Sequence, residues 1–191
     1  DVTLNLNILL EKSGHGGTLD PKVTGVLPIA LQDATRIVQA LLPAGKEYIA
    51  LMRLHAPVPE EKIQKIFQKF QGTITQLPPV RSAVKRQYRE RNIYYMNILK
   101  IQDQYVLFKV GCQAGTYIRK LIHNMGEELQ GGAHMFQLVR TKAGPLTDKD
   151  WVSLQDLKDA YEFYKKRKKK EIKKCNQPIE AAVTHMKKIW I

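Results

Sequence analysis

Apolar side chains recur at helical spacing in several separate stretches of the chain. Residues 59–70 show it best, because Pro59 and two acidic residues open the stretch and Gly72 follows it. Its apolar stripe consists of Ile63, Ile66, Phe67 and Phe70. Such a stripe predicts an amphipathic helix that buries one face. The same spacing predicts a helix over 116–129, another over 33–42 with Asp33 as its N-cap, one that starts near Ser153 and a short one near 178–186.

Other stretches alternate with a period of two, which predicts strands. The stretch 46–55 is apolar on both faces in its middle, as an internal strand is. The stretches 92–101 and 104–112 predict a hairpin that turns around Gln102 and Asp103, and 134–143 predicts a further strand. Residues 23–31 suit a buried extended segment, whereas 2–10 fit either a strand or the end of a helix. With hairpin-like pairs and no βαβ repeat, the pattern predicts an α+β fold.

The stretch GHGGTLDP at 14–21 follows neither period. Its three glycines allow the backbone to approach a ligand closely, and Pro21 holds the residue before it in an extended conformation. We therefore expect Asp20 on a fixed, non-helical loop. The Asp20 side chain either makes a local Asx turn or acts as a nucleophile. A nucleophilic aspartate needs a nearby cation to keep it ionised. Arg119, near the start of the predicted 116–129 helix and off its apolar stripe, is the best-placed cation; the alternative is an ordinary surface arginine.

The charge of the chain indicates what kind of partner it binds. The formal net charge is +13, from 31 basic and 18 acidic residues, and the isoelectric point is near 9.7. Nucleic acid is the first candidate. The stretch 80–91 places Tyr88 among five basic residues, which are Arg81, Lys85, Arg86, Arg89 and Arg91. It predicts a loop that tracks phosphates with an aromatic platform, although a solvated charged face has the same composition.

Several kinds of partner find no support in the sequence. No apolar run approaches the roughly 18 residues needed to span a bilayer, so no membrane partner is expected. The five histidines are scattered without metal-ligand spacing, and neither a Walker A nor a dinucleotide-binding motif occurs. Neither a metal nor a cofactor is therefore expected. Two isolated cysteines, Cys112 and Cys175, favour a reducing compartment.

Five blocks of sequence point to a family. They are GHGGTLDPKVTGVL at 14–27, AGKEYIA at 44–50, LPPVRSAVKRQ at 77–87, AGTYIRKLIHNMG at 114–126 and LVRTKAGPL at 138–146. In this order they resemble the TruB/dyskerin family of pseudouridine synthases, and HGGTLDPK and RSAVKRQ resemble its guide-RNA-dependent branch. The similarity covers nearly all of residues 12–191 and is greatest to the catalytic domain of an archaeal dyskerin homologue. It implies the pseudouridine synthase fold, a mixed and mostly antiparallel sheet flanked by helices.

The resemblance assigns roles to residues at matching positions. It implies that Asp20 is the catalytic aspartate, that Arg119 pairs with it and that Tyr48 stacks on the flipped base. The residues implied to contact RNA or to line the uracil pocket are His15, Gly16, Gly17, Lys46, Arg81, Lys85, Arg86 and Leu138, of which Lys46 has no assigned role. Val139 departs from the family pattern, because members often carry another arginine there.

The implied activity is guide-RNA-directed isomerisation of uridine to pseudouridine in rRNA, with tRNA as a second substrate and without a cofactor. The implied partners are an H/ACA guide RNA, the substrate RNA and small accessory proteins of the H/ACA particle. The implied compartment is the cytoplasm, or the nucleolus in a eukaryote. We expect residues 1–191 to be a catalytic domain without its N-terminal strand and without the C-terminal PUA domain. A stand-alone tRNA pseudouridine synthase and a basic RNA-binding scaffold without activity are the alternatives.

Overall fold

A computed structural model describes residues 11–78, 86–149, 151–166 and 170–183. The chain divides into two compact units. Unit 2 consists of residues 19–25 and 43–142, and unit 1 contains the remainder of the chain. In the part of the chain that the structure describes, no helix is long and apolar enough to cross a membrane.

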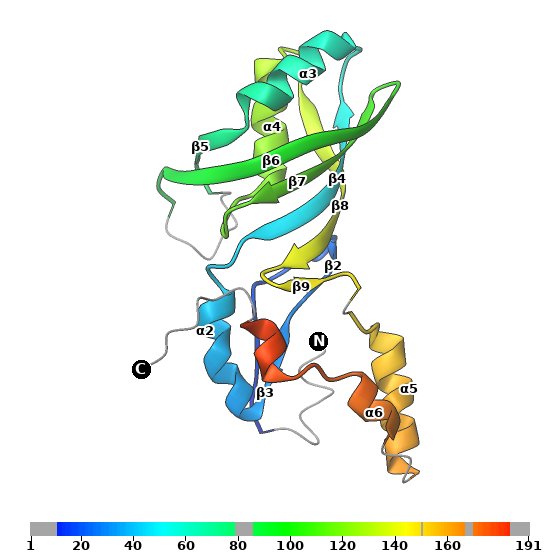
Figure 1. The fold of residues 1–191 in the computed structure, drawn as a ribbon. Helices are drawn as coiled ribbons and strands as arrows, with labels where there is room; N and C mark the ends of the chain where they lie inside the picture. Colours follow the sequence, from blue (N-terminus) through cyan, green and yellow to red (C-terminus); the bar gives the residue numbers. More distant parts are fainter. Residues whose placement is uncertain (1–10, 79–85, 150, 167–169, 184–191) are drawn as a thin grey trace. The chain divides into compact units, whose positions relative to one another are not determined.

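Unit 2 is built on a mixed sheet whose strands run in the order β2-β8-β4-β7-β6-β5 (Figure 1). These strands are β2 (Thr24–Gly25), β8 (Ala133–Ala143), β4 (Lys46–Leu54), β7 (Tyr105–Cys112), β6 (Arg89–Gln102) and β5 (Gly72–Gln76). The pairs from β4 through β5 are antiparallel, whereas β2 runs parallel to β8. The predicted hairpin is confirmed as β6 and β7, and Asp103 in its turn has a φ of 52°.

Two helices, α3 (Glu60–Lys69) and α4 (Ile118–Glu128), pack on one face of this sheet. Both were predicted from their apolar stripes, and those stripes are buried. Alternate residues of β4 and β7 meet them, among them Met52 and Phe108, which have no exposed surface. The rings of Phe67 and Phe108 pack edge to face with their centroids 5.0 Å apart. Burial of this apolar face is the main stabilising contribution in unit 2.

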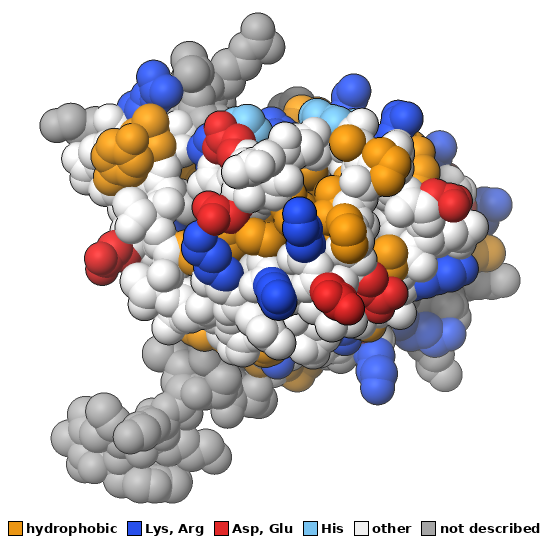
Figure 2. Space-filling model, turned by 90° about the horizontal axis from the view of Figure 1, so that it is seen from above, with side chains coloured by type: hydrophobic (Ala, Val, Ile, Leu, Met, Phe, Trp, Pro, Cys, Tyr) orange, Lys and Arg blue, Asp and Glu red, His pale blue; other side chains and the backbone are white. Residues whose placement is uncertain are grey.

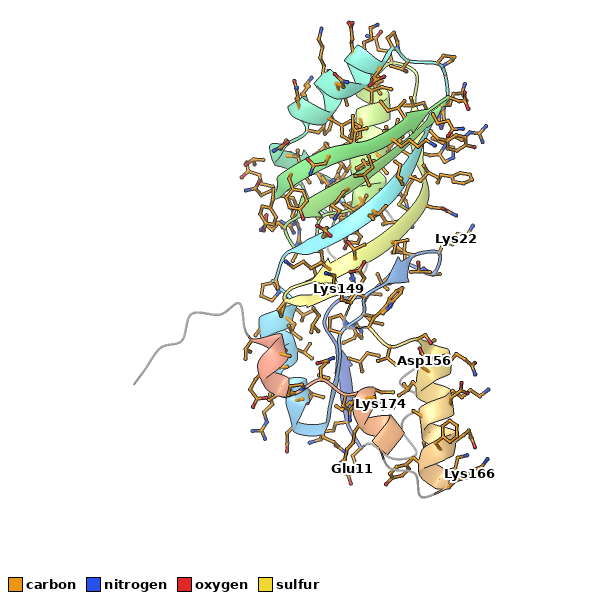
Figure 3. The ribbon with its side chains drawn as sticks, turned by 45° about the vertical axis from the view of Figure 1, so that its right-hand side comes forward. Glu11, Lys22, Lys149, Asp156, Lys166 and Lys174 are labelled. Atoms are coloured by element: carbon orange, nitrogen blue, oxygen red, sulfur yellow. The ribbon has the colours of Figure 1, made fainter. Side chains whose placement is uncertain are left out.

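Unit 1 consists of short elements. β1 (Ser13–His15) pairs antiparallel with β3 (Ile29–Leu31), and the 3-10 helix η1 (Gln32–Ile37) and α2 (Val38–Leu41) follow. The later elements are β9 (Leu146–Thr147), α5 (Leu154–Lys165), α6 (Lys170–Lys174) and the 3-10 helix η2 (Ile179–Ala182). The predicted start of α5 is confirmed, because Ser153 caps the helix in a reciprocal pair with Asp156, which lies in its first turn (Figure 3).

Two local predictions are wrong. The predicted helix over 33–42 begins as η1, and Leu31 rather than Asp33 precedes it. The reason is that Gln32 has a φ of 53° and donates its N–H to Lys12, which fixes the entry to the helix before Asp33 is reached. The predicted loop over 80–91 ends earlier than expected, because Arg89 and Arg91 pair with β5 as the start of β6. Residues 2–10 and 79–85 lie outside the described part of the chain.

Candidate catalytic site

Asp20 lies on a turn in unit 2. Its carbonyl accepts a hydrogen bond from the N–H of Val23 over 2.8 Å, so Pro21 occupies the second position of a tight turn, where its fixed φ is favourable. The chain then enters β2, whose pairing with Val139 and Arg140 attaches the segment to β8. Gly25 has a φ of 116°, and a Cβ there would lie 2.1 Å from the carbonyl oxygen of Arg140. Only glycine fits this position, so the Asp20 turn is held against β8.

Arg119 reaches Asp20 from the first turn of α4. Its Nη2 lies 2.5 Å from Oδ2 of Asp20, and each side chain is 55% exposed. The start of α4 is held by Gln76 of β5, which is only 2% exposed. The Gln76 amide accepts the N–H of Tyr117 over 3.0 Å and donates to the Tyr117 carbonyl over 3.1 Å. A buried glutamine therefore fixes the backbone from which Arg119 extends.

Tyr48, Lys46 and Arg140 form the inner part of the site. Lys46 is 8% and Arg140 2% exposed, and the Lys46 ammonium donates to the carbonyl of Ala44 over 2.8 Å. Burial and the nearby Arg140 charge lower the pKa of Lys46 to about 8. Burial raises the pKa of Tyr48, and Cys112 and, to a smaller extent, Asp20 raise it further, whereas the charge of Arg140 and a hydrogen bond to it lower it. Tyr48 therefore experiences both Asp20 and Arg140.

The remaining predicted residues lie in several places. Leu138 is buried in the core of unit 2, and Tyr48 packs against the same cluster. In unit 1, His15 is exposed at the end of β1, whereas Gly16 is buried and donates its N–H to Pro28 over 2.9 Å. The next residue, Gly17, has a φ of 126°. Arg86 is exposed, and Arg81 and Lys85 lie outside the described residues.

Sequence reasoning missed Gln76 and Arg140 as parts of this site. Arg140 shares the alternation of β8 with Leu138, so a position that a strand pattern buries carries a charged residue. A buried arginine is uncommon unless it has partners. The position of Arg140 on the buried side of a predicted strand could therefore have marked it as a functional residue. Gln76 offered no such signal, because its partner Tyr117 is 41 residues away in the sequence.

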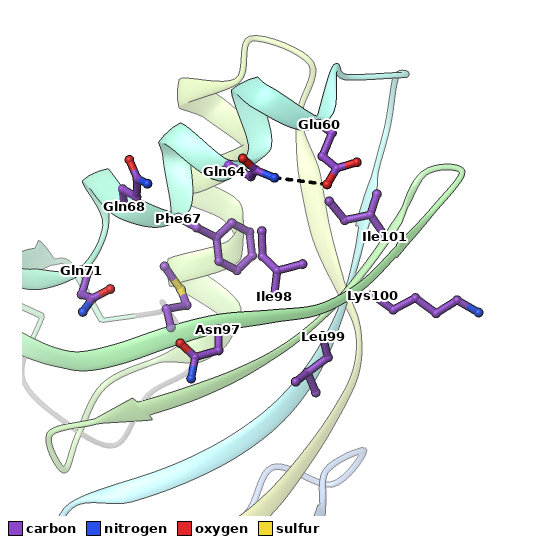
Figure 4. A pocket seen from close by; sticks show the side chains of 11 residues that line it. Glu60, Gln64, Phe67, Gln68, Gln71, Asn97, Ile98, Leu99, Lys100 and Ile101 are labelled. Carbon is purple, nitrogen blue, oxygen red and sulfur yellow. Dashed lines mark hydrogen bonds between the residues drawn. The ribbon is translucent and has the colours of Figure 1, made fainter.

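A second concavity lies elsewhere in unit 2. It is a groove of about 530 Å³ between α3 and β6 (Figure 4). Glu60 and Gln64 form part of its rim, where the Gln64 amide donates to the Glu60 carboxylate over 3.2 Å, and Phe67 and Ile98 contribute apolar walls. The groove shares no lining residue with the Asp20 site. On the face seen in Figure 2, acidic and basic side chains are interspersed, so the basic excess is not gathered there.

The geometry of the Asp20 site suits chemistry on a molecule that arrives from solvent. A half-exposed carboxylate is held by a guanidinium, and its charge reaches the Tyr48 ring, which in turn interacts with the buried Arg140. A carboxylate placed in this way can act as a nucleophile or a base. An aromatic ring such as that of Tyr48 can in principle stack on a planar group.

Two family models match the chain. The N-terminal domain of TruB family pseudouridylate synthases matches residues 6–61 and 55–118. The C-terminal domain of tRNA pseudouridylate synthase B matches residues 119–184. Together they cover most of the chain.

Curated relatives agree with these matches. The probable tRNA pseudouridine synthase B of Pyrococcus abyssi is 59% identical over 184 residues, which is 95% of this chain and 55% of that protein. The corresponding protein of Methanopyrus kandleri is 55% identical over 183 residues, covering 95% of this chain and 54% of its own length. The chain thus spans a little over half the length of these relatives.

Solved structures confirm the expected fold. A chain from a Cbf5-Nop10-Gar1 complex is 56% identical, with a TM-score of 0.91, and the match covers 96% of this chain and 57% of that one. A chain from an H/ACA RNP bound to a substrate RNA containing 2'-deoxyuridine is 52% identical, with a TM-score of 0.86 and coverage of 96% and 56%. The mixed, mostly antiparallel sheet with flanking helices is therefore the fold of these proteins.

Proposed function

This chain belongs to the TruB family of pseudouridylate synthases, and we propose that it isomerises uridine to pseudouridine in RNA. The observation that carries the proposal is the ion pair between Asp20 and Arg119, which joins two of the sequence blocks that define the resemblance. In this reaction uracil leaves the ribose at nitrogen, rotates and rejoins the sugar through carbon 5. We propose residues 1–191 as the catalytic domain of the enzyme.

Asp20 is the reactive group in this proposal. A carboxylate beside the sugar either attacks it or removes a sugar proton, and both routes require the ionised form. Arg119 supplies the opposite charge at 2.5 Å and fixes one carboxylate oxygen. The other oxygen remains available to the substrate, because the side chain is half exposed.

Tyr48 provides the stacking surface. A uridine within stacked RNA is out of reach until its base is flipped out, which costs a few kcal/mol. Stacking on an aromatic ring recovers about 1–3 kcal/mol for each base. Tyr48 packs against the core and is approached by Arg140, so its ring is already held in place before RNA arrives. Leu138, from the same cluster, lines the uracil pocket in this proposal.

We propose that a guide RNA selects the target and that small accessory proteins complete the particle. The support is the similarity to chains solved in a Cbf5-Nop10-Gar1 complex and in an H/ACA RNP with substrate RNA. His15, Gly16, Gly17 and Arg86 are then contacts to RNA, as are Arg81 and Lys85. The solved relatives include an archaeal particle, and the compartment we propose is the cytoplasm.

A second candidate is a tRNA pseudouridine synthase that acts without a guide. The names of the curated relatives favour it, since they are called probable tRNA pseudouridine synthases B. The two candidates differ in one requirement. Product on tRNA without guide RNA supports the second, and product only with a matching guide supports the first.

The test compares Asp20→Asn with the wild-type protein, each assembled with guide RNA, substrate RNA and accessory proteins. Pseudouridine formation is read by base-specific chemical mapping. We expect product from the wild type and none from Asp20→Asn. Asp33→Asn is the matched control, because this side chain is 97% exposed and lies in unit 1; it should retain activity.

Product from Asp20→Asn at the wild-type rate would reject Asp20 as the reactive group. If neither protein forms product while both bind RNA with strong salt dependence, the basic scaffold without activity becomes the correct interpretation.

A further inference from the structure

A hydrogen-bond network lies on the sheet face opposite the catalytic side chains. Side chains alternate along β4, so Lys46 and Tyr48 face the helices and Glu47, between them, faces the other way. The Glu47 carboxylate accepts the Tyr95 hydroxyl over 2.5 Å and the Thr141 hydroxyl over 2.7 Å. Lys109 Nζ lies 3.6 Å from the same carboxylate. These four residues, the Glu47 network, come from four different strands.

A glycine makes the contact between Tyr95 and Glu47 possible, although the two residues lie on strands that are not neighbours in the sheet. Tyr95 is on β6 and Glu47 on β4, and β7 lies between them (Figure 1). Gly111 of β7 is paired with both residues, and a shift of register just before Tyr95 brings it opposite Gly111. A Cβ at Gly111 would lie 2.4 Å from the Tyr95 ring. The missing side chain therefore lets the Tyr95 ring cross β7 and reach Glu47.

The carboxylate of Glu47 is held in its ionised form. Burial raises its pKa, but the hydrogen bonds from Tyr95 and Thr141 and the charge of Lys109 outweigh burial, and the net pKa lies below the ordinary value. Burial, followed by the hydrogen bond to Glu47, raises the pKa of Tyr95 to about 12. The proton therefore stays on the tyrosine, and the acceptor stays charged, which favours a strong hydrogen bond.

The network is placed where it can control the site. Glu47 is flanked in β4 by Lys46 and Tyr48, and Thr141 follows Arg140 in β8. The hydrogen bond between Glu47 and Thr141 thus joins β4 and β8 next to Tyr48 and Arg140. A shift of one strand against the other would move Tyr48 relative to Arg140 and the Asp20 turn, which is attached to β8.

We propose that Glu47 is a positioning residue that sets the place of Tyr48 and Arg140 through the Tyr95 and Thr141 hydroxyls on the reverse face of the sheet. This inference rests on the proposed function. It predicts that loss of either hydroxyl slows the chemical step without weakening RNA binding, because no member of the Glu47 network shares the sheet face of Tyr48.

The test uses the full-length protein with guide RNA, substrate RNA and accessory proteins, and measures the single-turnover rate and the Kd for the substrate RNA separately. We expect Tyr95→Phe and Thr141→Val each to lower the rate by about 10-fold, since small displacements of catalytic groups are costly, while Kd stays within about twofold. Thr141→Ser keeps the hydroxyl and should restore the rate. Tyr105→Phe is the matched control, because Tyr105 lies on β7 and contacts Phe136 and Arg53 instead.

The outcomes separate this inference from the proposed function. If the wild type forms no pseudouridine, the proposed function fails and this inference with it. If the wild type is active and both hydroxyl deletions keep its rate, only the positioning role is overturned. A rise in Kd at an unchanged rate would also overturn it, since the network would then act on binding.

Discussion

Arg119 and Asp20 meet at the surface, where each side chain is 55% exposed. Exposed ion pairs stabilise a fold by about 0–1 kcal/mol, because water screens the charges and both side chains lose entropy. The pair therefore contributes more to the position of the carboxylate than to the stability of unit 2. Activity and stability should respond differently when it is broken.

We expect Arg119→Gln to slow pseudouridine formation by about 100-fold, since Asp20 loses its orientation and its opposite charge. The urea midpoint should change little, for the reason just given. Arg53→Gln is the control, since Arg53 is exposed and lies over the Tyr105 ring. A large loss of stability in Arg119→Gln would show that the arginine is structural instead.

Lys46, unlike the exposed pair of Asp20 and Arg119, carries its charge in a buried position. Its pKa of about 8 lies below the ordinary lysine value, so between these pH values the unfolded chain binds more protons than the folded one. The contribution of Lys46 to stability therefore rises with pH from about 8 to about 10, by up to about 1.4 kcal/mol for each pKa unit. Urea unfolding of the wild type and of Lys46→Met across this range measures it. A difference between the two that is independent of pH would contradict the lowered pKa.

Among the secondary structure elements, α3, α4, α5 and the β6–β7 hairpin could be predicted from the sequence. Each has a long apolar period or a clear turn, so local information suffices. β5 could not, because GTITQ is short and has a single large apolar residue. The same limit applies to the site. Asp20 and Arg119 stand in recognisable motifs, whereas Gln76 and Glu47 act through partners that only the folded sheet brings near.

The two hydrogen bonds from Gln76 to the backbone of Tyr117, just before α4, give a prediction about the stability of this helix. Gln76→Leu removes both side-chain hydrogen bonds to the backbone of Tyr117, whose carbonyl still accepts the N–H of Leu121. Loss of the hydrogen bond to the Tyr117 N–H costs about 1–3 kcal/mol. We expect the free energy of unfolding to fall by about 1–3 kcal/mol in urea denaturation. Gln71→Leu is the control, because Gln71 is exposed at the end of α3. Equal stability of the two variants would mean that the hydrogen bonds from Gln76 do not hold the start of α4.

For the whole molecule, we expect the net charge of +13 to govern the proposed binding to RNA. Each phosphate contact adds about 0.7 to the slope of log affinity against log salt for a single strand. We expect Arg86→Ala to reduce this slope by about that amount and to weaken binding equally for all sequences. Arg53→Ala should leave the slope unchanged. Filter-binding titrations at several salt concentrations measure both, and an unchanged slope in Arg86→Ala would exclude a phosphate contact.

The ion pair between Asp20 and Arg119 joins residues that are 99 positions apart in the sequence. The Asp20 segment, residues 19–25, is separated from the rest of unit 2 by residues that belong to unit 1. Closing such a long loop carries an entropy cost that must be met before the contact forms, and distant contacts slow folding. The β6–β7 hairpin and α4 need only local closure. We therefore expect the β6–β7 hairpin and α4 to form ahead of the ion pair, so that the proposed catalytic site is completed late as the chain folds.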